Sequence, residues 1–72
     1  MSIIITLQVG YILIGCKLDV FKSIHEKYIS DEKFNITDIS NNTHKIESRN
    51  YKDLYFLLKM LSSDITLDIR MS

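Results

Sequence analysis

Apolar and polar residues alternate along both ends of the chain. In residues 3–14 every odd position is apolar and β-branched residues are abundant, and residues 65–71 alternate strictly. Because successive side chains of a strand point to opposite faces, both segments predict β-strands. Gly10 would be a bulge or kink in the long first strand. A hairpin that turns at Val9 and Gly10 is the alternative, although it lacks the usual turn residues.

Two other segments show the periodicity of helices. Asp19 can cap the first, in which apolar residues recur at helical spacing to about Ser30. Asn50 can cap the second, which continues through strong helix formers until residues 62–64. The sequence therefore predicts one helix in each half of the chain.

Between the two predicted helices, residues 33–40 and 43–48 alternate weakly and flank Asn41 and Asn42. Asparagine tolerates a positive φ, so the pair is typical of a two-residue hairpin turn. The segment predicts a β-hairpin, and it is the least apolar part of the chain.

The predicted order of strand, helix, strand, strand, helix, strand resembles the ferredoxin-like βαββαβ architecture. The expected fold class is therefore α+β, with an antiparallel four-stranded sheet and two helices on one face. Right-handed crossovers would place the first and last strands at the sheet centre and the hairpin strands towards the edges. A chain of 72 residues has room for one compact domain, spanning residues 1–72.

Charge and cysteine content narrow the classes of function. Nine Lys and Arg residues balance nine Asp and Glu residues, so the chain lacks the basic excess of typical DNA-binding domains. Cys16 is the single cysteine and cannot close an intrachain disulfide. We therefore expect a reducing, cytoplasmic location.

The residues from Leu13 to Cys16 resemble the cleavage box of bacterial lipoproteins. No Lys or Arg precedes Ile3, and Thr6 and Gln8 interrupt the apolar stretch, which is also too short to span a bilayer. We therefore expect the end of a strand here and no membrane association.

Candidate catalytic groups are few and scattered. Nothing in the sequence fixes His25 or His44 near the other or near Cys16, and no zinc-binding spacing is present. The carboxylates around the predicted hairpin are Asp31, Glu32, Asp38 and Glu47. We expect no catalytic, cofactor or metal site. An enzyme would require a cleft in which His25 or His44 approaches two of those carboxylates.

The second predicted helix is apolar around most of its circumference, whereas a helix with one neighbour needs an apolar stripe of roughly 100°. The surplus either packs on the first helix or forms a protein interface. The residues expected to bind a partner are Phe56, Leu57, Met60, Lys52 and Lys59. A second candidate interface is the strand face carrying Ile4, Ile12 and Ile14.

These observations favour a small, non-enzymatic protein-binding module, such as a phage or mobile-element inhibitor of a host defence protein. Its partner would be another protein or a second copy of the chain. The alternative is a nucleic-acid-binding or nucleic-acid-processing domain, which the zero net charge disfavours. That alternative requires one surface to gather Lys45, Arg49, Lys52 and Lys59.

Overall fold

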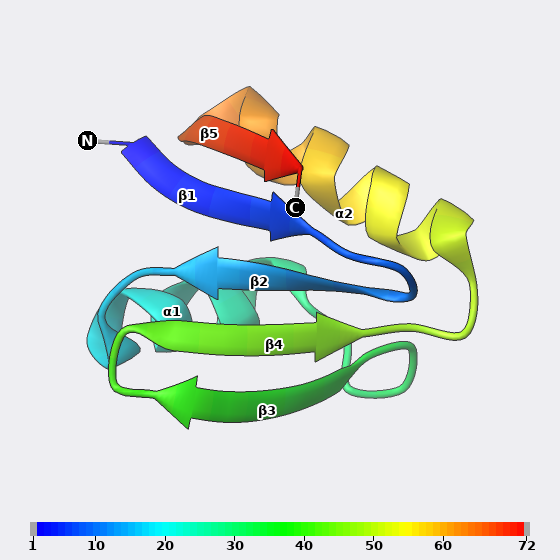
Figure 1. Cartoon of the computed structure of the whole chain (residues 1–72), viewed down its shortest axis with the longest axis horizontal. Coiled ribbons are helices and arrows are strands. Elements are labelled where there is room, and N and C mark those ends of the chain that lie inside the picture. Colours follow the sequence, from blue (N-terminus) through cyan, green and yellow to red (C-terminus); the bar gives the residue numbers. More distant parts are fainter. Residues whose placement is uncertain (1, 72) are drawn as a thin grey trace.

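The computed structural model describes residues 2–71, which form a five-stranded mixed sheet with two helices behind it (Figure 1). In chain order the elements are β1 (Ser2–Leu7), β2 (Tyr11–Gly15), α1 (Leu18–Tyr28), β3 (Asn35–Ser40), β4 (Thr43–Glu47), α2 (Tyr51–Asp64) and β5 (Thr66–Met71). The strand order is β3-β4-β2-β1-β5. β5 runs parallel to β1, and the other neighbouring strands are antiparallel.

The α+β class with two helices is confirmed, but the four-stranded antiparallel ferredoxin-like sheet is wrong. The first predicted strand is a hairpin of two strands, so the sheet has a fifth strand. β5 lies at an edge of the sheet rather than at its centre, and it pairs in parallel with β1. The predicted hairpin contributes one edge strand, β3, and one inner strand, β4.

The turn between β1 and β2 explains why the apolar pattern looked like one long strand. Gly10 has a φ of +86°, a conformation that glycine adopts without the steric strain of a side chain. In the hairpin register Ile5 lies opposite Ile14, so odd residues of β1 and even residues of β2 share one face. The buried residues change parity at Gly10, from Ile3 and Ile5 to Ile12 and Ile14, because the chain turns there.

The core lies between the sheet and the two helices. It is formed by Ile3, Ile5, Ile12, Ile14 and Ile46 from the sheet, Phe21 and Ile24 from α1, and Leu54, Leu57 and Leu61 from α2, with Ile29 and Phe34 at its margin. Each of these buried side chains removes apolar surface from water, which is the main force holding so small a domain together. The Tyr28 hydroxyl also donates a hydrogen bond to Asp64, joining the end of α1 to the end of α2.

The two predicted helix caps differ in outcome. The Asn50 side chain accepts a hydrogen bond from the Lys52 backbone N–H at 3.0 Å, which confirms it as the cap of α2. In α1 the cap position belongs to Lys17, which makes no capping hydrogen bond through its side chain. Asp19 instead lies in the first turn, where its negative charge stabilises the positive end of the helix dipole.

The predicted hairpin at Asn41 and Asn42 is confirmed, although no residue other than Gly10 in the described part of the chain has a positive φ. Next to the turn Ser40 pairs with Thr43, but the following pair is Asp38 with His44. Ile39 is therefore the extra residue of a β-bulge. The bulge leaves Ile39 exposed and places Asp38 on the same side of the sheet as His44.

Residues 13–16 end β2 and begin its connection to α1, as the sequence predicts for the lipoprotein-like segment. Ile14 in this segment is fully buried against the core. Within residues 2–71 neither helix has the length and apolar character needed to cross a membrane.

Candidate functional site

His44 is the polar side chain at the centre of the packed interior, and it is fully buried. Its Nδ1 lies 2.9 Å from the Asp38 carboxylate and its Nε2 lies 3.1 Å from the Cys16 carbonyl oxygen. The Phe21 ring stacks on it with a centroid separation of 4.1 Å. Both polar neighbours are acceptors, so a neutral imidazole with one N–H can donate to one of them, whereas the imidazolium donates to both.

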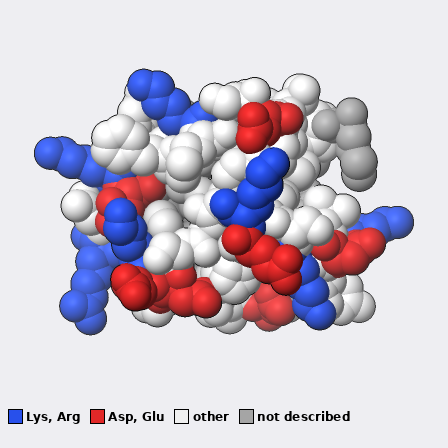
Figure 2. Space-filling model, turned by 180° about the vertical axis from the view of Figure 1, so that it is seen from behind, with Lys and Arg blue, Asp and Glu red and all other residues white. Residues whose placement is uncertain are grey.

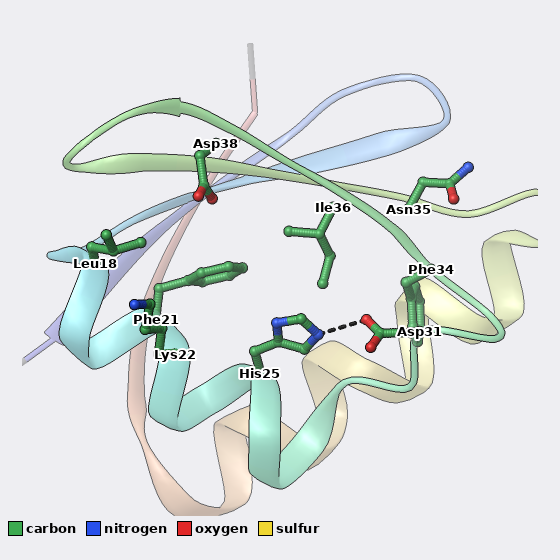
Figure 3. A pocket seen from close by; sticks show the side chains of 9 residues that line it. All are labelled: Leu18, Phe21, Lys22, His25, Asp31, Phe34, Asn35, Ile36 and Asp38. Carbon is green, nitrogen blue, oxygen red and sulfur yellow. Dashed lines mark hydrogen bonds and ion pairs between the residues drawn. The ribbon is translucent and has the colours of Figure 1, made fainter.

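His25 and Asp31 form a second pair at the mouth of a cleft between α1 and β3. The His25 Nε2 lies 2.6 Å from the Asp31 carboxylate, and Figure 3 shows this contact at the cleft wall. The cleft has a volume of about 440 Å³. Its lining residues are Leu18, Phe21, Lys22, His25, Asp31, Phe34, Asn35, Ile36 and Asp38.

His25, Asp31 and Asp38 line the cleft, whereas His44 does not, and each histidine contacts one carboxylate rather than two. Both ring nitrogens of His44 are engaged within the protein, so neither faces a substrate in the cleft. Among residues 2–71 no group of three or more His, Cys, Asp or Glu side chains is arranged to hold a metal ion. We call His44 and its contacts Asp38, Phe21 and the Cys16 carbonyl the His44 cluster, which joins β3 and β4 to α1.

Cys16 lies where β2 leads into α1, is partly buried and packs against the core. Burial raises the pKa of its thiol, and the nearby negative charge of Asp19 raises it further. The thiolate is the reactive form of cysteine, so this setting suppresses nucleophilic chemistry.

The outer surface of α2 carries the most concentrated exposed apolar area of the described chain. We define this surface as Tyr51, Lys52, Tyr55, Phe56, Lys59 and Met60. Phe56 is 58% exposed and Met60 is 48% exposed. The rings of Tyr55 and Phe56 meet edge to face at 6.1 Å, and the Lys59 ammonium lies 5.8 Å from the centre of the Tyr55 ring.

The structure separates the residues expected to bind a partner into two groups. Phe56, Met60, Lys52 and Lys59 lie on the outer surface of α2, whereas Leu57 is fully buried in the core. Leu57 faces the sheet because it lies on the same side of the helix as Leu54 and Leu61. It has no surface to offer a partner, so its place among the binding residues is corrected.

The second candidate interface, on the first predicted strand, does not exist as one surface. Ile12 and Ile14 are core residues, and Ile4 lies on the opposite, open face of the sheet. The β1–β2 turn separates them, because it reverses which parity faces the helices. Apolar residues fill the odd positions on both sides of Gly10, so the alternation in the sequence did not reveal this division.

The four basic residues required by the nucleic-acid alternative do not gather on one surface. Lys45 projects from β4 on the open face of the sheet, where its ammonium lies 4.6 Å from the centre of the Tyr11 ring. Lys52 and Lys59 lie on the outer surface of α2, and Arg49 lies in the loop before that helix. On the side of the molecule seen in Figure 2, basic and acidic residues are interspersed.

No protein-family model matches the chain, and comparisons with curated proteins and with solved structures find no match.

Proposed function

We propose that the chain is a small, non-enzymatic protein-binding module that uses the outer surface of α2. The observation that carries the proposal is the exposure of Tyr51, Tyr55, Phe56 and Met60 along one helix. The first helix does not cover them, although the sequence left that possibility open. Aromatic and methionine side chains are enriched at the buried centres of protein interfaces, and exposed apolar patches mark interaction sites.

The surface also indicates the chemistry of its partner. Lys52 and Lys59 lie on the helix surface between the two tyrosines and the pair of Phe56 and Met60. Asp53, the one acidic residue between the two lysines in sequence, is half-buried. A partner with an apolar pocket bordered by carboxylates would bury Phe56 and Met60 and pair with both ammonium groups. The module would act by occupying that pocket, as a mobile-element inhibitor of a host protein does.

The test is affinity capture with matched variants. The wild-type chain and a Phe56→Glu/Met60→Glu variant are immobilised and exposed to a lysate of the source cells, and recovered proteins are compared by mass spectrometry. We expect one acidic protein to be recovered by the wild-type chain and lost with the variant. Its affinity for the purified variant should fall about thirtyfold or more, because the two substitutions remove the anchor residues.

Val9→Glu supplies the control, since Val9 is 87% exposed, lies in the β1–β2 turn and is not part of the outer surface of α2. This variant should capture the same protein as the wild-type chain. Circular dichroism and thermal unfolding should be unchanged in both variants. If Phe56→Glu/Met60→Glu retains capture, or if Val9→Glu loses it equally, the proposal is wrong.

A further inference from the structure

β5 ends the sheet and has an unpaired edge within the described chain. It pairs on one side with β1 in unbroken register, from Ser2 opposite Thr66 to Leu7 opposite Met71. The strand contains no proline and no bulge. A long, regular edge strand of this kind is a template on which another strand can form backbone hydrogen bonds.

The sequence of β5 is complementary to itself when two copies run antiparallel. If a two-fold axis passes beside Ile69, that residue faces its own counterpart in the second copy. Asp68 then faces Arg70, and Leu67 faces Met71, on both sides of the axis. Opposite charges and apolar side chains facing each other across antiparallel strands stabilise the pairing.

The apolar residues and the charged residues of β5 lie on opposite faces of the sheet. Leu67, Ile69 and Met71 lie on the helix side of the sheet, in register with Ile3, Ile5 and Leu7. Asp68 and Arg70 lie on the open face, where they form an ion pair at 3.0 Å within the chain. A second β5 would therefore match an apolar row with an apolar row and a charged row with a charged row.

Two of the three residues in the apolar row of β5 are exposed, whereas Leu67 packs against the core. Ile69 is 49% exposed and Met71 is 84% exposed. Between α2 and β5 lies a groove of about 340 Å³, lined by Leu7, Tyr55, Leu58, Lys59, Ser62 and Ile69. The apolar residues of a paired β5 would extend the floor of this groove and cover the exposed part of Ile69, which removes apolar surface from water.

We propose that two copies of the chain associate through β5, with the strands antiparallel about Ile69, to form one sheet that continues through both copies. The interface is isologous, because each copy contributes the same residues and a two-fold axis closes the assembly. Phe56 and Met60 lie on the side of α2 away from the groove lining. The groove shares Tyr55 and Lys59 with the outer surface of α2, so partner binding is tested at Phe56 and Met60, which do not line the groove.

The first measurement is the mass of the purified wild-type chain in solution across a concentration series, by sedimentation equilibrium. A dimer in reversible equilibrium with the monomer is expected. Ile69→Lys should abolish the dimer, because it brings two positive charges face to face at the axis. Ile39→Lys, on the exposed bulge of the opposite edge strand, is the matched control and should leave the dimer intact.

The decisive test uses the two charged positions. Asp68→Arg and Arg70→Asp each place like charges opposite each other twice in the interface, so each should raise the dimer dissociation constant about tenfold or more. The double variant Asp68→Arg/Arg70→Asp should restore dimerisation. An equimolar mixture of the two single variants should form a heterodimer, because one then offers two positive charges and the other two negative charges.

The mixture separates the proposed interface from effects within one chain, since both single variants lose the internal ion pair between Asp68 and Arg70. A wild-type chain that stays monomeric at all concentrations overturns the proposal, including one whose β5 edge pairs instead with a strand of another protein. A wild-type dimer that ignores Ile69→Lys, or a mixture that fails to form heterodimers, overturns it equally.

Discussion

The two edge strands of the sheet, β3 and β5, differ in the regularity of their exposed backbone. β3 carries a bulge at Ile39, and its Asp38 side chain is held by the buried His44. β5 has no bulge and keeps a regular register with β1 over all six of its residues. Bulges and charged side chains are devices by which natural proteins prevent edge strands from pairing with other chains.

The difference suggests that one edge of the sheet is closed to pairing and the other is open. At β3 the extra residue twists the strand locally and breaks the ladder that a second strand would need. At β5 the ladder is uninterrupted, and the exposed residues match a second copy of themselves. The contrast between the two edges favours β5 over β3 as the site of the proposed dimer.

The largest effect should come from removing the residue that anchors the closed edge. His44→Ala deletes a fully buried ring that stacks on Phe21 and hydrogen-bonds to Asp38 and the Cys16 carbonyl. The substitution leaves a cavity and an unpaired carbonyl group, so the free energy of unfolding should fall by about 3 kcal/mol. Urea denaturation followed by circular dichroism measures it.

Ile39→Ala provides the comparison within the same hairpin, because Ile39 is exposed on the bulge. Its effect on the free energy of unfolding should stay within about 0.5 kcal/mol. Similar losses in the free energy of unfolding for both variants would show that the buried His44 contributes no more to stability than the exposed Ile39.

A smaller effect on stability, but a change in association, is expected from deleting Ile39. The deletion removes the extra residue while Ser40 can still face Thr43 and Asp38 can still face His44. β3 would become a regular edge like β5, with a change in the free energy of unfolding of about 1 kcal/mol or less. The chain should gain a tendency to associate through β3.

Light scattering tests this in a chain that also carries Ile69→Lys, so that the β5 edge is blocked. Association that appears with the deletion and is absent without it would support the protective role of the bulge. A double variant that remains strictly monomeric would show that the polar side chains of β3 are sufficient protection.

The sequence predicted the elements whose apolar pattern has one period and clear ends. Asn50 marked the start of α2, and the alternation of residues 65–71 predicted β5. The strand count was wrong because the turn at Gly10 has no second turn residue beside it, so its apolar flanks resembled one strand. The pairing of β5 with β1 depends on contacts between the two ends of the chain, which local patterns do not contain.

The exposed surface of α2 was predicted in part and the His44 cluster was missed. Phe56 and Met60 are exposed as a binding surface requires, but helical spacing did not single out Leu57 as the core residue. His44 alternates with the buried Ile46, which was a signal for its inward orientation. Its contact with Asp38 depends on the bulge at Ile39, and a two-residue turn with regular pairing would have placed Lys45 opposite Asp38 instead.

The smallest predicted effect is on the rate at which the Cys16 thiol is alkylated, compared between variants at the two edges of the sheet. Burial, with a contribution from Asp19, raises the pKa of its thiol, so at a mildly alkaline pH less thiolate is present than in the unfolded chain. Alkylation by iodoacetamide should therefore be slower in the native chain than in urea, and its pH–rate profile should lie at higher pH.

Ile69→Lys should leave the alkylation rate of Cys16 unchanged, because it alters the edge at β5. His44→Ala should raise it a few-fold, because the Cys16 carbonyl loses its hydrogen bond and the segment opens more often. Equal rates in all three chains would show that the His44 cluster does not hold this part of the molecule closed.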